Sequence, residues 1–139
     1  MVFVDTSFFF ALASPGDPDH ERVREVFETF DRERLPQLWL TTNHVVFETI
    51  TLARKLDGHR AAVRIGVRLY REVLARIHWA TKDEEKRAFG YLAKHKDKGY
   101  SPVDCLSFVI MEARGIKEAL TLDGDFTHRF IARPGPKPK

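Results

Sequence analysis

The sequence lacks most features of a secreted or membrane-bound protein. It contains a single cysteine, Cys105, which excludes an intramolecular disulfide and a cysteine-rich zinc site. No apolar run is long enough to span a bilayer. The apolar start of the chain has no positively charged leader and is interrupted at Asp5, so we expect neither a signal peptide nor a membrane association. We therefore expect a protein of the cytoplasm, where a lone thiol stays reduced.

The residues that are present are sufficient for one folded domain. The chain has 139 residues, of which 43% are hydrophobic and 11 are phenylalanine, so it can bury a sizeable core. Its formal net charge of +3 permits an anionic partner such as nucleic acid but does not require one. We predict a single domain over residues 1–132, followed by a basic, proline-rich tail over residues 133–139 without fixed structure.

Short apolar segments alternate with longer segments of helical periodicity, which is typical of an α/β fold with a mostly parallel central sheet. Each predicted strand is followed by at least one predicted helix or by acidic residues. The predicted strands are residues 1–4, 38–41, 77–79 and 119–122, and the predicted helices are residues 8–13, 18–30, 42–57, 59–76, 81–96 and 101–114.

Four acidic residues occupy positions that this fold would bring together. Asp5 and Asp123 each follow a predicted strand, and parallel strands share one carboxyl edge. Asp104 is in the first turn of the helix that leads into the strand before Asp123, and such a helix begins at the same edge. Glu48 is in the second turn of a helix that follows a strand, and helical side chains lean toward the N-terminus. We therefore expect these carboxylates to meet.

Each acid also has a purely structural interpretation. Asp5 could cap the following helix, and Asp104 stands three residues after Ser101, in the position of a capping box. Glu48 could be an exposed surface acid, and Asp123 could begin a hairpin turn. If the four do meet, they raise one another's pKa and require a cation. Ligands that are all oxygen suit a hard ion, Mg²⁺ or Mn²⁺.

Arginines line one face of the predicted helix over residues 59–76. They recur at helical spacing opposite its apolar face and could follow the phosphates of a nucleic acid, or form an ordinary solvated face. A second basic segment, residues 94–98, connects two predicted helices. The arginines of the stripe are Arg60, Arg64, Arg68 and Arg71.

Four segments together resemble the PIN domain family, and within it the VapC-type toxins of prokaryotic toxin–antitoxin pairs. They are a strand ending in D-T-S at residues 5–7, a helix acid at Glu48, S-P-V-D-C-L-S at residues 101–107, and L-T-L-D-G-D-F at residues 120–126. The resemblance covers nearly the whole chain. Cys105 is a mild departure, because a small alanine is common at that position.

The resemblance implies a Rossmann-like α/β/α sandwich and an Mg²⁺- or Mn²⁺-dependent ribonuclease that cleaves RNA phosphodiester bonds with a metal-activated water. It also implies a homodimer and a VapB-like antitoxin that blocks the acidic cleft. The resemblance does not decide between Asp123 and Asp125 as the better ligand. The implied site consists of Asp5, Glu48, Asp104 and Asp123 as catalytic and metal-binding acids, Asp125 as an assisting ligand, and Thr6, Ser7 and Ser107 as supporting hydroxyls.

Three other functions are compatible with parts of the sequence. A metal-independent ribonuclease would use histidines as acid and base, but the six histidines form no recognisable pair. A haloacid-dehalogenase-like phosphatase would have a second Asp two residues after the first, where this chain has Ser7. A catalytically silent module that only binds RNA or protein is the alternative from a different class.

Overall fold

The computed structural model describes residues 1–138 and contains a central sheet whose strands all run parallel. The prediction of a mostly parallel sheet is therefore confirmed. The spatial order is β3-β2-β1-β4-β5, so β1 lies in the middle. The strands are β1 (Val2–Val4), β2 (Trp39–Thr42), β3 (Arg76–His78), β4 (Glu118–Thr121) and β5 (Ile131–Pro134).

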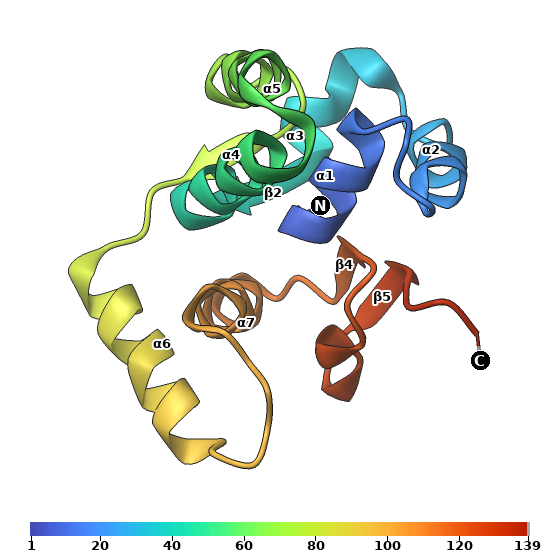
Figure 1. Cartoon of the computed structure of the whole chain (residues 1–139). Helices are drawn as coiled ribbons and strands as arrows, with labels where there is room; N and C mark the ends of the chain where they lie inside the picture. Colours follow the sequence, from blue (N-terminus) through green and yellow to red (C-terminus); the bar gives the residue numbers. More distant parts are fainter. Residues whose placement is uncertain (139) are drawn as a thin grey trace.

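Helices cover both faces of this sheet. In Figure 1, α1, α2, α4 and α5 lie on one side, and α7 lies on the other with α6 packed against it. None of the helices in residues 1–138 is both long and apolar enough to cross a membrane. The helices are α1 (Thr6–Ala13), α2 (His20–Phe27), α3 (Leu35–Leu38), α4 (Asn43–Asp57), α5 (His59–Tyr70), α6 (Lys82–Lys94) and α7 (Pro102–Arg114), with short 3-10 turns η1 (Arg32–Arg34) and η2 (Gly124–His128).

Trp39 is the centre of the core beneath α1. Its side chain is fully buried at the start of β2, and the rings of Phe8 and Phe30 meet it edge-on at centroid distances of 5.6 and 5.4 Å. Such perpendicular aromatic contacts contribute roughly 0.5–1.5 kcal/mol each beyond the burial of area. The dense phenylalanine run after β1 therefore fixes α1 against the sheet.

The arrangement of β1 and β4 sets the position of the acids. The two strands are neighbours, with Phe3 paired to Ala119 and Val4 to Leu120. The backbone N–H of Asp5 donates to the carbonyl of Leu120 at 3.0 Å. The carboxyl ends of the two strands are thus adjacent, as predicted.

The end of the chain differs from the prediction. Arg133 and Pro134, assigned from the sequence to the tail, are the last residues of β5, whose register pairs Pro134 with Thr121. Proline can occupy an edge strand because it needs no donor on the free side. The next residue, Gly135, has φ +77°, and a Cβ there would lie 3.1 Å from a carbonyl oxygen. Lys139 lies outside the described residues.

Helix α5 is shorter than its periodicity suggests. It ends at Tyr70 rather than near Arg76, and Glu72 has φ +53°, a left-handed conformation that cannot continue a right-handed helix. The Glu72 carboxylate instead accepts a hydrogen bond from the backbone N–H of Ile77 at 2.8 Å. Val73, which lies beyond the end of the helix, is 48% exposed.

Candidate functional site

Asp5 stands between β1 and α1 and is buried. Although it occupies the N-cap position, its side chain makes no capping hydrogen bond to the helix. Its Oδ2 accepts instead from the hydroxyls of Thr121 at 2.9 Å and Ser7 at 3.2 Å. Burial raises the pKa of Asp5 to about 7, and the charges of Asp104 and Asp123 add to this effect. The interpretation of Asp5 as a mere helix cap is therefore wrong.

Asp104 is both a helix cap and a member of the acid cluster. Its backbone N–H donates to the Ser101 hydroxyl at 3.0 Å, and its Oδ2 accepts from the Ser101 N–H at 3.1 Å, which completes a capping box. Burial raises the pKa of Asp104 to about 6, with the charges of Asp123 and Glu48 acting in the same direction and the Ser101 hydrogen bonds opposing them. The capping box fixes the carboxylate at the acid edge of the sheet.

Asp123 and Asp125 lie on the turn after β4. The Oδ1 atom of Asp123 accepts from the backbone N–H of Asp125 at 2.9 Å and caps η2. Burial raises the pKa of Asp123, and the charge of Asp125 contributes to the shift. One carboxylate oxygen from each of Asp104, Asp123 and Asp125 lies within 4.8 Å of the others. Since β4 and β5 are parallel, the alternative that Asp123 begins a hairpin turn is wrong.

Glu48 faces the other acids from α4. Its Oε1 accepts a hydrogen bond from the Thr6 hydroxyl at the start of α1. Its charge contributes to the raised pKa of Asp104, so the two carboxylates are close. Glu48 is half-buried, which excludes the alternative of a fully solvated surface acid.

Thr121 is a site residue that the sequence pattern alone did not indicate. It is buried at the end of β4, donates to Asp5, and accepts the backbone N–H of Asp123 at 3.0 Å. The Ser7 hydroxyl lies 3.2 Å from that of Thr121 and accepts from the N–H of Leu122 at 2.9 Å. A polar residue at the end of the strand, two residues before Asp123, was the available signal. Thr121 and Ser7 together join the tips of β1 and β4.

Ser107 does not reach the acids through a hydrogen bond. Its hydroxyl is fully buried and donates to the carbonyl of Val103, one turn earlier in α7, at 3.0 Å. This bond serves the helix and leaves no hydroxyl proton for the site.

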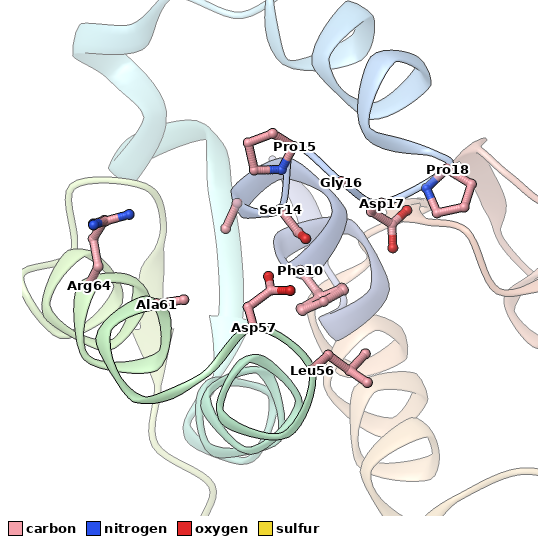
Figure 2. Close-up of a pocket in the computed structure, with 11 residues that line it drawn as sticks. Phe10, Ser14, Pro15, Gly16, Asp17, Pro18, Leu56, Asp57, Ala61 and Arg64 are labelled. Carbon is pink, nitrogen blue, oxygen red and sulfur yellow. The ribbon is translucent and has the colours of Figure 1, made fainter.

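The arginine stripe lies away from the acid cluster. Helices α1 and α4 both begin at the acid edge, so their C-terminal ends lie at the opposite edge. Arg64 lines the same pocket as Ser14 and Asp57, which lie at those C-terminal ends (Figure 2). Arg68 lies beside Leu12 and Ala13, and Arg60 and Arg71 are exposed on the same helix or at its end.

A different basic segment leads to the acid edge. The connector between α6 and α7 runs directly into the capping box that holds Asp104. Lys94, Lys96 and Lys98 are exposed at or beside this connector. The connector lysines therefore precede Asp104 by six to ten residues in the chain, whereas the arginine stripe lies at the opposite edge of the sheet.

The chemistry of the cluster suits a divalent metal ion. Its members offer only carboxylate oxygens, the ligands preferred by hard cations, and no histidine or cysteine joins the group within residues 1–138. Burial first, and the charges of the neighbouring acids second, raise the pKa values of Asp5, Asp104 and Asp123 and so disfavour their charged forms, a cost that a bound cation would reduce. The carboxylate oxygens of Asp104, Asp123 and Asp125 lie close enough together to coordinate a single ion.

Comparisons with known proteins cover nearly the whole chain. The family model described as "PIN domain" matches residues 2–129. The 23S rRNA-specific endonuclease VapC20 of Mycobacterium tuberculosis, represented by two strains, is 39% identical over 128 residues, which is 91% of this chain and 92% of that protein.

Several solved structures align with most of this chain. The crystal structure of M. tuberculosis VapC20, described as a sarcin-ricin-loop-cleaving toxin, aligns with a TM-score of 0.83 at 35% identity over 92% of this chain and 94% of that chain. FitAcB from Neisseria gonorrhoeae aligns with a TM-score of 0.65 at 16% identity, over 95% and 96% of the two chains. A toxin–antitoxin complex from Klebsiella pneumoniae aligns with a TM-score of 0.60 at 14% identity, over 88% and 87%. The last two comparisons show the fold alone.

Proposed function

The chain belongs to the PIN domain family, and on this basis we propose that it is a ribonuclease toxin that hydrolyses RNA phosphodiester bonds at its acid cluster. The observation that carries the proposal is the convergence of carboxylates from four separate segments: the end of β1, α4, the start of α7 and the turn after β4. Raised pKa values in one cleft are typical of functional acids.

We propose that Asp104, Asp123 and Asp125 hold Mg²⁺ or Mn²⁺. When bound, such an ion lowers the pKa of water and stabilises negative charge on the phosphoryl oxygens. Asp5 completes the negative wall of the site, and its orientation is fixed by the Thr121 and Ser7 hydroxyls.

Glu48 is the acid best placed to accept a proton from the attacking water. Its Oε1 is held by the Thr6 hydroxyl, and its Oε2 makes no hydrogen bond within residues 1–138. A carboxylate with one oxygen anchored and the other free keeps its orientation while remaining able to act as a base. His128 on η2 lies next to Asp125, but its Nδ1 bonds the backbone carbonyl of Asp125 and its Nε2 the hydroxyl of Tyr91, each at 2.8 Å. Because both ring nitrogens are engaged and no histidine joins the carboxylate group within residues 1–138, the metal-independent mechanism is disfavoured.

For the substrate, we propose large-subunit ribosomal RNA. The support is the name of VapC20, a 23S rRNA-specific endonuclease that this chain resembles over nearly its whole length. Antitoxin-free protein with Mn²⁺ is expected to cleave 23S rRNA in intact ribosomes at one position, and excess EDTA is expected to stop the reaction. Primer extension locates the cut. Cleavage that survives EDTA would favour a histidine mechanism, and RNA binding without cleavage would favour a silent module.

We further propose that a VapB-like antitoxin covers the acidic cleft and that two copies of the chain form a homodimer. The Klebsiella structure supports the first part, since it contains a toxin with its antitoxin. Exposed aromatic side chains support the second: Phe47 on α4 is 66% exposed and Phe89 on α6 is 69% exposed. Light scattering of the antitoxin-free protein would show twice the mass of one chain, and a monomeric mass that holds at high concentration would exclude the homodimer.

The connector lysines are expected to bind the RNA backbone. Replacing Lys94, Lys96 and Lys98 together by Glu should weaken RNA binding and reduce the slope of log affinity against log salt by about 1 for each phosphate that is no longer neutralised. Filter binding at several salt concentrations measures both quantities. The matched control replaces Arg60, Arg64 and Arg68 by Glu, and should leave the slope unchanged because these side chains lie away from the acids. If the arginine variant loses affinity and salt slope while the lysine variant keeps both, the arginine stripe and not the connector binds the RNA.

A further inference from the structure

A pocket of about 640 Å³ opens at the opposite end of α1 from the acid cluster. It lies between the C-terminal ends of α1 and α4 and the side of α5, and Figure 2 shows the side chains that face it. The residues that line it include Phe10, Ser14, Asp17, Leu56, Asp57 and Arg64. None of the acids of the proposed ribonuclease site lines this α1–α4 pocket, so its function is independent of the RNA cleavage proposed above.

Ser14 carries a hydroxyl without a partner. The residue is only 5% exposed, and its hydroxyl makes no hydrogen bond with any of residues 1–138. It is not sealed inside the protein either, because the fully enclosed unpaired side-chain atoms of the described chain belong to Trp39 and Arg133. Figure 2 shows the Ser14 oxygen turned toward the Asp57 carboxylate across the pocket. A buried hydroxyl gains a hydrogen bond here only from something that enters the pocket.

The charges around the pocket favour a cation. Asp57 and Asp17 both line it, and neither forms an ion pair within residues 1–138. Oδ1 of Asp17 accepts from the N–H of Asp19 at 2.8 Å, which leaves its second oxygen available. Helices α1 and α4 both end at this pocket, and helix C-termini carry partial negative charge. Arg64 stands at the rim, and Figure 2 shows its guanidinium turned away from Asp57.

The remaining walls are apolar. Phe10, which is part of the hydrophobic core, and Leu56, which is 59% exposed, both line the pocket. Pro15 and Pro18 hold the connecting turn. An apolar wall next to a carboxylate and a free hydroxyl suits a charged head on a short aliphatic stem.

We propose that the α1–α4 pocket binds an organic cation, an ammonium or guanidinium group on a short aliphatic chain. The head lies between Asp57 and Ser14, where the hydroxyl accepts an N–H, and the stem lies against Phe10 and Leu56. Such a group is available as a free amine or as an arginine or lysine side chain of a peptide, and the two sources share the same recognition chemistry.

The test uses agmatine as the probe and two-dimensional NMR of the full chain in saturating Mg²⁺, which keeps the probe from the acid cluster. Saturable shifts are expected in residues 10–18 and 56–64. The isosteric variant Asp57→Asn should weaken binding by about tenfold or more, because a charge-assisted hydrogen bond is removed. Ser14→Ala, which removes no intramolecular bond, should also weaken it. Asp83→Asn on exposed α6 is the matched control and should bind like the wild type.

Two further arms separate the outcomes. An acetylated and amidated Gly-Arg-Gly peptide that binds more tightly than agmatine would identify a peptide side chain as the source of the cation, and weaker binding would identify a free amine. N-butylurea, a neutral analogue of the guanidinium end of agmatine and its aliphatic stem, should not bind. Equal binding of N-butylurea, or shifts unaffected by Asp57→Asn, would overturn the proposal. Absence of any saturable shift with both agmatine and the peptide would also overturn it.

Discussion

Replacement of Asp104 by Asn is expected to reduce RNA cleavage by more than about 100-fold, because loss of an outer partner of a metal ligand alone costs about 10–100-fold. The substitution removes one carboxylate from the group of three that lies within 4.8 Å. It keeps the fold, since the amide oxygen of Asn can still accept the N–H of Ser101 and preserve the capping box. Initial rates at saturating Mn²⁺ and thermal melting by circular dichroism measure the two effects separately.

The control for this experiment is another Asp→Asn change outside the cluster. Asp83 is exposed in the first turn of α6, and its one ion pair within residues 1–138 is with Arg87, at 3.0 Å. Asp83→Asn is expected to cleave RNA at the wild-type rate. Wild-type activity in Asp104→Asn would instead show that the cluster is not the site of cleavage.

Replacement of Asp5 by Asn is expected to stabilise the metal-free protein at pH 8. Burial raises the pKa of Asp5 from 3.8 to about 7, so between these values the folded state binds more protons than the unfolded state. The free energy of unfolding therefore falls as the pH rises from about 4 to about 7, and the loss is complete above pH 7. At about 1.4 kcal/mol per pKa unit, the destabilisation that Asn removes is at most about 4 kcal/mol.

Urea unfolding in EDTA at pH 5 and pH 8 measures this effect. Wild type should lose stability between the two conditions, and Asp5→Asn should lose much less, with the remainder of the change arising from Asp104, whose pKa is raised to about 6. Asp83→Asn should follow the wild type. A lower stability of Asp5→Asn than of wild type at pH 8 would mean that the Asp5 carboxylate is not held under electrostatic stress.

The convergence of the acids could be predicted from the sequence because it depends on topology. Parallel strands share a carboxyl edge, and a helix that leads into a strand begins at that edge, so Asp5, Asp104 and Asp123 had to meet once β1 and β4 were neighbours. The choice between cap and ligand for Asp104 could not be made in this way. The structure shows that the capping box and membership of the acid cluster coexist, since the capping box uses Oδ2 and the carboxylate still belongs to the cluster.

Other features could not be predicted from the sequence, because they depend on contacts between distant segments. Strand β5 contains Arg133 and Pro134, which lack the apolar pattern of a buried strand, and its pairing with β4 is a tertiary event. The periodicity of α5 correctly predicted that its arginines share one face of the helix. It could not show that this face lies away from the acids, because the position of a helix relative to the sheet depends on how the helices pack. Thr121 was missed because its role appears only when two strand tips meet.

Calorimetric titration of antitoxin-free protein with Mn²⁺ measures whether the gathered carboxylates hold a divalent cation. We predict saturable binding to the wild type and to Asp83→Asn, with no binding to Asp104→Asn at the same protein concentration. Absence of binding to the wild type, or equal affinity in wild type and Asp104→Asn, would show that the carboxylates do not form a metal site.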